Sequence, residues 1–219
     1  MAELVVLNGA SNIARSTVRS LLQNNFGMYY KSVKVLDSRP FRQSVYNWQR
    51  SLAGVNVDKV MARSAASIDI NIEGATDVVY FTHDYFTMAS DKNAHLQIAS
   101  QLCKKHGVEN FVAVTPIEHD LAWSEDDESY YQKAVEAEQI TLQNNPNATI
   151  LRTNLTFGPE SHLIHFLSQC ALTGKCPYKN LIAQNKFNFA PVYTDELAFI
   201  VGQALDSTTP GRYSVSGPS

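Results

Sequence analysis

A serine, two tyrosines and a lysine, each able to donate or hold a proton, begin the segment SYYQKAVEAE. A tyrosine four residues before a lysine shares a helix face with it, so that the ammonium lowers the pKa of the phenol, which can then protonate a substrate carbonyl. The residue four before Lys133 is Ser129. Tyr130 and Tyr131 are displaced by about 100° and 200° around the helix. Since a serine hydroxyl is a far weaker acid, we expect no catalytic residue here.

Thr115 ends an apolar run in FVAVTP, where its hydroxyl could reach a substrate carbonyl beyond the end of a strand. As a turn residue before Pro116 it needs no such role. We interpret Thr115, Ser129 and Lys133 as degenerate remnants of a catalytic set. Lys133 is then either a remaining cofactor contact or an exposed lysine on a surface helix.

The segment LVVLNGASNIARSTVRSLL joins an apolar run, a turn of small residues and an amphipathic run. Such a unit binds the pyrophosphate of a dinucleotide when three glycines, spaced by three residues, form the turn. In that register the chain has Asn8, Ser11 and Ala14. Asparagine tolerates a positive φ best among ordinary residues, and serine and alanine are small. We therefore expect weakened nucleotide binding, or none if the turn excludes the nucleotide, with any pyrophosphate over Ser11–Ile13 at the helix N-terminus.

Charged residues near this turn indicate which dinucleotide would fit. Asp37 follows the second apolar run, where an acidic residue accepts the hydrogen bonds of an adenosine ribose and favours NAD. Arg15 and Arg39 could instead receive the 2′-phosphate of NADP. A plain turn with two solvated arginines is the alternative, and it is the weaker one because Asp37 is correctly placed after the first βα unit. The predicted cofactor-binding residues are Asn8, Gly9, Ser11, Asn12, Ile13, Arg15, Asp37, Arg39, Thr82 and Lys133.

Metal-capable side chains occur in THDY and IEHD, at His83, Asp84 and Glu118–Asp120. Successive residues point apart, so no metal site is expected. An odd number of cysteines without a CxxC pair favours neither a disulfide framework nor a zinc site, and burial as small hydrophobes is the default. These cysteines are Cys103, Cys170 and Cys176.

The composition is that of an ordinary globular protein. The 219 residues are 44% hydrophobic and 18% charged, with a formal net charge of -3. This balance gives no electrostatic reason to expect nucleic acid as a partner. No apolar stretch reaches the roughly 18 to 20 residues that span a bilayer. Strand-like residues begin at Glu3, so no secretory signal or presequence is visible.

Short β-rich runs alternate with longer helical ones, which predicts an α/β, doubly wound, mostly parallel sheet of the Rossmann type. We expect residues 1–151 to form this core and residues 152–219 to form a small extension packed on the same domain. Helices are predicted after the first turn, from Ser90 or Asp91 to Gly107, over Glu128–Asn144 and Ser161–Leu172, and from Thr194 or Asp195. The predicted strands are Leu4–Leu7, Val33–Leu36, Val55–Met61, Val78–Phe81, Phe111–Val114 and Thr149–Leu151, with a strand-like NFAPVY later.

The order of these pieces resembles the extended and atypical short-chain dehydrogenase/reductase (SDR) superfamily, including its epimerase-like and NmrA-like branches. VVLNGASNIAR stands at the glycine-rich turn, KKHGVENFVAVT at the helix and strand that end in the catalytic serine or threonine, and YYQKAVEAE at the Tyr-x-x-x-Lys helix. The resemblance extends nearly from end to end and implies binding of NAD(H) or NADP(H).

Within that superfamily the chain is most similar to the nucleotide-binding accessory subunits of mitochondrial respiratory complex I. The similar segments are HDYFTM, NPNATILRTNLTFGPESHLIHFL, FAPVYTDELA and YSVSGP, after which the family has further C-terminal sequence. The resemblance implies a non-catalytic subunit on the matrix side of the inner membrane, with a structural NADP(H) and other subunits of the complex as partners. Apolar side chains such as Phe166, Leu167 and Phe199 should then be covered by a partner. The alternatives are an active NAD(P)-dependent reductase or epimerase that recruits Tyr130 or Tyr131, and an NmrA-like dinucleotide-sensing regulator.

Overall fold

The computed structural model describes residues 2–23, 30–38, 41, 55–81, 92–116, 125–154, 156–158, 162–174, 190–206 and 209–217, with the backbone alone at residues 12, 56, 92–94, 116, 125–134 and 162–167. The helices are α1 (Asn12–Gln23), α2 (Ala65–Ile72), α3 (Lys92–His106), α4 (Glu125–Asn144), α5 (His162–Thr173) and α7 (Thr194–Asp206). The strands are β1 (Ala2–Leu7), β2 (Tyr30–Asp37), β3 (Asn56–Met61), β4 (Asp77–Phe81), β5 (Asn110–Pro116), β6 (Thr149–Thr153), β7 (Thr156–Phe157), β8 (Val192–Tyr193) and β9 (Gly211–Val215).

Seven of these strands form one sheet in the order β3-β2-β1-β4-β5-β6-β9. Each neighbouring pair is parallel. The strand order reverses between β1 and β4, which makes the carboxyl ends of these two strands the topological switch point. The predicted doubly wound, parallel α/β sheet is therefore confirmed.

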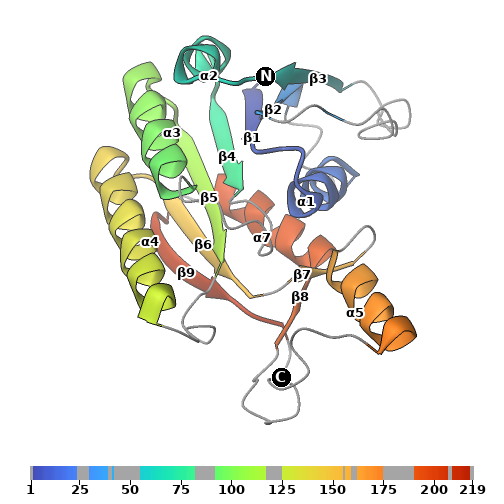
Figure 1. Cartoon of the computed structure of the whole chain (residues 1–219). Coiled ribbons are helices and arrows are strands. Elements are labelled where there is room, and N and C mark those ends of the chain that lie inside the picture. Colours follow the sequence, from blue (N-terminus) through green and yellow to red (C-terminus); the bar gives the residue numbers. More distant parts are fainter. Residues whose placement is uncertain are drawn as a thin grey trace.

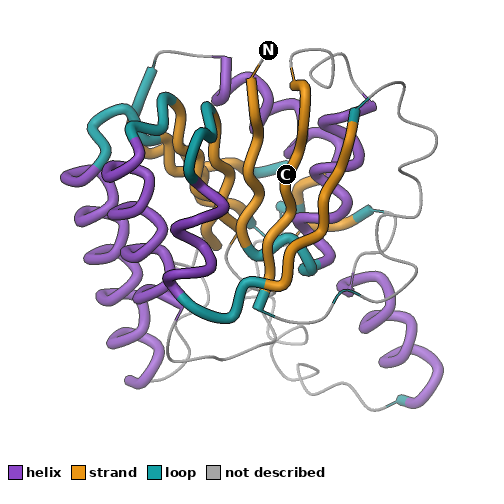
Figure 2. Tube along the Cα trace, turned by 90° about the horizontal axis from the view of Figure 1, so that it is seen from above, coloured by secondary structure: helices purple, strands orange, loops and turns teal. Residues whose placement is uncertain are grey.

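Helices cover both faces of the sheet, as Figures 1 and 2 show. Because successive strand residues point to opposite faces, Leu4 and Val6 of β1 belong to one core, and Val5 and Leu7 to the other. The first core lies under α1 and α7, whose side chains Val18 and Leu197 are buried in it. The second lies under α2, α3 and α4, which contribute Ile72, Leu96, Ala99, Cys103 and Ala137.

A buried polar cluster joins the amino ends of β2, β4 and β5. The Asn110 side chain donates to Asp77 Oδ1 over 2.7 Å, and Tyr30 is hydrogen-bonded to the same carboxyl group. Burial raises the pKa of Asp77, against the opposing effect of these two hydrogen bonds. Burial also raises the pKa of Tyr30, and the nearby Asp77 adds to that shift. The cluster lies at the end of the sheet opposite the switch point, so its role is structural.

The C-terminal part contributes one strand to the main sheet. Strand β9 pairs with β6 along its length and becomes the last strand of the main sheet. The alternation of the sequence does not predict this strand, because its three middle residues are exposed at the sheet edge. Strands β7 and β8 form a separate two-stranded sheet, and α5 lies apart from the main sheet in both views (Figures 1 and 2).

The described residues contain neither a membrane-spanning helix nor a cluster of metal ligands. No helix among them is long and apolar enough to cross a membrane. Within the same residues, no group of three or more His, Cys, Asp or Glu side chains could hold a metal ion. The metal-capable residues His83, Asp84 and Glu118–Asp120 lie outside the described ranges, as do the predicted cofactor residues Arg39 and Thr82.

Candidate functional site

The turn after β1 contains one glycine, Gly9, where a dinucleotide-binding turn has three. Asn8, at the first glycine position, has a φ of 59° in the left-handed region. Asparagine is among the few residues other than glycine that adopt this conformation at low cost. The Gly9 amide then donates to Leu36 O of β2 over 2.9 Å, which ties the turn to the neighbouring strand.

The Asn8 side chain also spans the switch point. Its Nδ2 donates to the carbonyl oxygen of Phe81, the last residue of β4, over 2.8 Å. The amide thereby joins the carboxyl ends of the two strands between which a dinucleotide crosses in this fold class. A glycine at position 8 would lack this hydrogen bond, so the asparagine both adopts the left-handed turn conformation and adds a side-chain link between the two strand ends.

Ser11 and Ala14 occupy the second and third glycine positions. The Ala14 amide donates to Ser11 Oγ over 3.1 Å, so Ser11 is the N-cap of α1. Ser11 is 1% exposed, and Ala14 is fully buried in the core between α1 and the sheet. Glycine at the third position serves close helix–strand packing, and alanine is the next smallest residue that can do so. The N-terminus of α1 consequently lies at the carboxyl end of β1, as an anion site requires.

Asp37 supports the turn itself. The Ala10 amide donates to Asp37 Oδ2 over 2.9 Å, and Asp37 is only 2% exposed at the end of β2. In this position the carboxylate lies against the backbone of the turn. Little of its surface is accessible to the ribose hydroxyls that the sequence predicts it to bind.

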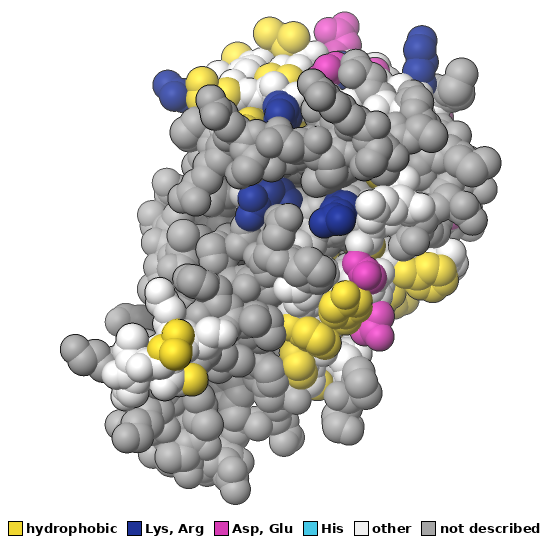
Figure 3. All heavy atoms as spheres, turned by 90° about the vertical axis from the view of Figure 1, so that its right-hand side faces the viewer, with side chains coloured by type: hydrophobic (Ala, Val, Ile, Leu, Met, Phe, Trp, Pro, Cys, Tyr) yellow, Lys and Arg dark blue, Asp and Glu magenta, His cyan; other side chains and the backbone are white. Residues whose placement is uncertain are grey.

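Basic side chains lie next to the turn. Arg15 is half-buried in the first turn of α1, and its amide donates to Ser11 O over 3.0 Å. Arg19 is half-buried one helical turn further on. Figure 3 views the molecule from the side that carries α1 and shows Lys and Arg side chains gathered near the middle of that face. This face can therefore attract a phosphate group.

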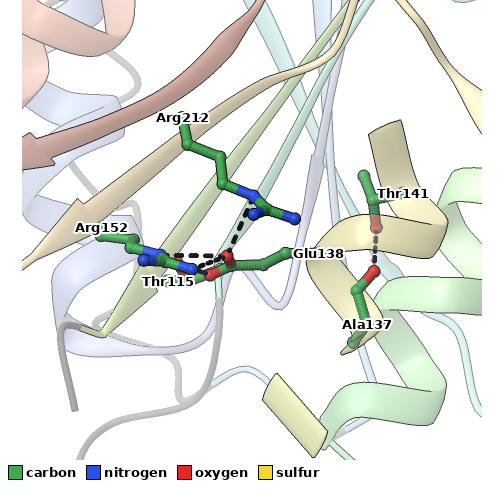
Figure 4. A network of polar contacts seen from close by, with 6 residues as sticks. All are labelled: Thr115, Ala137, Glu138, Thr141, Arg152 and Arg212. Atoms are coloured by element: carbon green, nitrogen blue, oxygen red, sulfur yellow. Dashed lines mark hydrogen bonds and ion pairs between the residues drawn. The ribbon is translucent and has the colours of Figure 1, made fainter. Parts of the chain in front are cut away.

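Thr115, at the predicted catalytic position, belongs to a network of charged groups (Figure 4). Its hydroxyl donates to Glu138 Oε1 over 3.1 Å. Arg152 of β6 binds the same carboxylate through Nε at 3.0 Å and Nη2 at 2.5 Å. Arg212 of β9 lies 3.5 Å from Glu138 Oε2. The side chain of Glu138 is 4% exposed, so this carboxylate is buried between two guanidinium groups.

This arrangement fixes the direction of the Thr115 hydrogen bond. A carboxylate only accepts, so the single hydroxyl proton of Thr115 is directed to Glu138. The hydroxyl can still accept a hydrogen bond, but it cannot at the same time donate to a substrate carbonyl. The substrate contact that the position of Thr115 would allow is therefore not available in this arrangement.

The other predicted remnants lie in α4. The helix begins at Glu125, three residues before the predicted start, and ends at Asn144 as predicted. Ser129 and Lys133 lie within it, as do Tyr130 and Tyr131, but the structure does not describe their side chains. Whether Lys133 contacts a cofactor stays a prediction.

Sequence reasoning missed Glu138, Arg152 and Arg212. A signal was present for Arg152, which interrupts the buried strand β6 between Leu151 and Thr153. A charged residue within a buried strand requires a partner. The sequence could not identify that partner, because it comes from a different element of the fold.

No family model matches the sequence, and no curated protein matches it. Among solved structures, the dTDP-glucose 4,6-dehydratase DesIV of Streptomyces venezuelae, with NAD and TYD bound, is 18% identical with a TM-score of 0.73, over 97% of this chain and 75% of that one. The Bordetella bronchiseptica enzyme WbmH in complex with NAD+ is 16% identical with a TM-score of 0.70, over 99% and 75%.

A shorter neighbour matches over almost its whole length. A short-chain dehydrogenase/reductase of Veillonella parvula in complex with NADP is 14% identical with a TM-score of 0.64, over 99% of this chain and 95% of that one. At such identities the likeness establishes the fold alone. The chain therefore has a Rossmann-type α/β fold similar to that of these enzymes.

Proposed function

We propose that the chain binds a nicotinamide dinucleotide, with its pyrophosphate at the N-terminus of α1. The observation that carries the proposal is the turn, which keeps the left-handed residue at Asn8 and the helix cap at Ser11 without the family's glycines. Structural neighbours solved with NAD or NADP support the same ligand class. When bound, such a group supplies hydride chemistry, whereas the turn supplies binding and orientation only.

The ligand proposed is NADP(H) rather than NAD(H). The buried position of Asp37 against Ala10 removes the feature that favoured NAD. Arg15, in the first turn of α1, is the charged side chain that the described residues place next to the helix N-terminus. A guanidinium group suits the planar, bidentate recognition of a phosphate.

We propose further that the bound nucleotide is structural. Ser129 stands where the family has its tyrosine, and the Thr115 proton is held by Glu138. Neither of the two positions that donate a proton to the substrate in the family can do so here. A subunit of mitochondrial respiratory complex I, on the matrix side of the inner membrane, is the assembly that we propose, and this part rests on the sequence resemblance alone.

An active NAD(P)-dependent reductase or epimerase is the second candidate. It is favoured by the neighbours, which include a sugar-nucleotide dehydratase bound to NAD. This function requires Tyr130 or Tyr131 to donate the proton that Ser129 cannot. A regulator that senses the dinucleotide would need the same binding site but no proton donor.

Calorimetric titration with NADPH and NADH tests the binding proposal. The wild-type protein should bind NADPH. Arg15→Ala should lower the affinity for NADPH by about tenfold or more, since a charge-assisted hydrogen bond contributes roughly 1.5 to 3 kcal/mol. The affinity for NADH should change little. Arg19→Ala, one turn further along the same helix, is the matched control. No binding of either nucleotide by the wild-type protein would refute the proposal.

Turnover assays separate the two candidates. With NADPH or NADH and a panel of carbonyl and nucleotide-sugar substrates, the structural role predicts no detectable rate. A robust rate that disappears in Tyr130→Phe or Tyr131→Phe would establish the enzyme instead.

A further inference from the structure

The carboxylate of Glu138 has no acceptor position left for Arg212. Its Oε1 accepts from the Thr115 hydroxyl at 3.1 Å and from Arg152 Nε at 3.2 Å. Its Oε2 accepts from Arg152 Nε at 3.0 Å and from Arg152 Nη2 at 2.5 Å. Since each carboxylate oxygen has two lone pairs, Thr115 and Arg152 together saturate Glu138. Arg212 Nε lies 3.5 Å from Oε2, beyond the ordinary length of a hydrogen bond.

Arg212 therefore keeps donors for another acceptor. A guanidinium group carries N–H donors on all three nitrogens, in a planar fork. Within the part of the chain that the structure describes, the contact with Glu138 is the one polar contact of this side chain. The dashed line in Figure 4 joins Glu138 to the Nε edge of Arg212, and both Nη atoms are left for a further partner. The Arg212 side chain is 31% exposed, so a ligand can reach these atoms from solvent.

The charges of this network do not balance. Two guanidinium groups, of Arg152 and Arg212, face the single carboxylate of Glu138, so two positive charges and one negative charge leave a formal charge of +1. The Arg152 side chain is 16% exposed, about half as much as that of Arg212, so the excess charge lies on the solvent side of the network. A partly buried positive charge without a full partner favours the binding of an anion.

Ser214 of β9 adds a hydroxyl group on the same face of the sheet. It is exposed, and it lies directly opposite Arg152 in the pairing of β6 with β9. Because Ser214 is two residues from Arg212, strand alternation places both on the side of the sheet that carries α4 and Glu138. Alternate residues of a strand are separated by about 7 Å. A single phosphate group with a hydrogen bond at each side can bridge that span.

The position of these groups in the fold also favours a ligand. Thr115, Arg152 and Ser214 are each the next-to-last residue of their strands. Ligands of open α/β sheets bind outside the carboxyl ends of the strands. The turn at Ser11 follows β1, and β9 is the fourth strand from β1 in the sheet, which corresponds to about 19 Å. The network is therefore separate from the proposed nucleotide site.

We propose that Arg212 and Ser214 bind the phosphate group of a small molecule at this edge of the sheet. The Arg212 guanidinium donates two parallel hydrogen bonds to two phosphate oxygens, and the Ser214 hydroxyl donates one to the third. A phosphate monoester offers three terminal oxygens and neutralises the excess charge, whereas a carboxylate offers only two oxygens. Glu138 orients Arg212, and Arg152 holds Glu138 in place. The proposal does not depend on nucleotide binding.

The arginine Nε–Hε signals in proton–nitrogen NMR spectra test the proposal at the residue itself. The Arg212 signal is identified by its absence from the spectrum of Arg212→Lys. Inorganic phosphate, glycerol 3-phosphate, acetate and chloride are titrated separately into the full chain at pH 7 and constant ionic strength. Both phosphates should move the Arg212 signal to saturation, with dissociation constants at least about fivefold below that of acetate. Chloride should leave the signal almost unmoved.

One variant and two other arginines locate the binding. Ser214→Ala removes one hydrogen bond and should raise the dissociation constant for phosphate by about threefold or more. Arg63 is exposed and serves as the matched control, so its signal should not move. Phosphate bound at the N-terminus of α1 would instead move the signal of Arg15, so the two sites are measured separately.

The proposal fails if phosphate leaves the Arg212 signal unmoved, or if chloride at equal ionic strength moves it as far. Equal movement of the Arg63 signal would reveal unspecific attraction of anions. An unchanged dissociation constant in Ser214→Ala would show that the hydroxyl is not part of the site. Binding of inorganic phosphate without binding of glycerol 3-phosphate would exclude a phosphate monoester as the ligand.

Discussion

Asn8 combines a backbone role and a side-chain role that substitutions can separate. Its φ of 59° costs an alanine about 1 to 2 kcal/mol, and costs glycine nothing. Its hydrogen bond to Phe81 O, at 2.8 Å, contributes about 1 kcal/mol. Asn8→Gly should therefore lose about 1 kcal/mol through the hydrogen bond alone, whereas Asn8→Ala should lose about 2 to 3 kcal/mol through both effects.

Thermal unfolding followed by circular dichroism measures both variants. For a domain of this size 1 kcal/mol corresponds to roughly 2 to 4 °C, so the melting temperature should fall by about 2 to 4 °C in Asn8→Gly and by about 4 to 12 °C in Asn8→Ala. Asn8→Gly should bind NADPH at least as tightly as the wild-type protein, because it removes a side chain from the crevice. If the two variants melt at the same temperature, Asn8 does not have the left-handed conformation in the folded protein.

Further substitutions test the rest of the structure. Burial raises the pKa of Asp77 above its ordinary value of 3.8. The protonated Asp77 carboxyl group therefore stabilises the folded state fully below pH 3.8, and this contribution is lost as the pH rises through the pKa of the folded state. Asp77→Asn should therefore unfold at a higher temperature than the wild type at pH 7 and at nearly the same temperature at pH 3.5. Glu138→Gln should cost about 3 to 5 kcal/mol in denaturant titrations because it removes the negative charge that pairs with the largely buried Arg152 guanidinium, whereas Arg212→Ala should cost less than about 1 kcal/mol because the Arg212 side chain is more exposed. Gly158→Ala should lower the melting temperature, since a Cβ there would lie 2.2 Å from Thr194 Oγ1; Thr194→Ala in the same chain should restore part of the loss, and no recovery would contradict this contact.

Much of the sheet could be predicted because its strands are buried on both faces. Val5 and Val78, for example, lie in continuous apolar runs between helical periods. Strand β9 was not predicted, because its residues Arg212, Tyr213 and Ser214 lie at the sheet edge and do not form an apolar run. Local patterns record burial, and an edge strand is only partly buried.

In the candidate site, too, local features could be predicted from the sequence and contacts between distant residues could not. The tolerance of Asn8 for a positive φ follows from residue type, and the structure has that conformation. The hydrogen bonds from Ala10 to Asp37 and from Thr115 to Glu138 join residues far apart in the chain. Only the folded chain brings such groups together, so the sequence predicted ribose binding for Asp37 and a degenerate catalytic remnant at Thr115, and did not anticipate either partner.

The central claim is that a dinucleotide lies on the turn at Ser11, and one substitution addresses it most directly. Aspartate is as good an N-cap as serine, so Ser11→Asp should retain the helix cap while placing a negative charge where the pyrophosphate would lie. Calorimetric titration with NADPH should then show binding lost in Ser11→Asp, and strengthened in Ser11→Gly, which restores the glycine and removes the Cβ. Unchanged affinity in both folded variants would contradict the account, because the nucleotide could not then be bound at this turn.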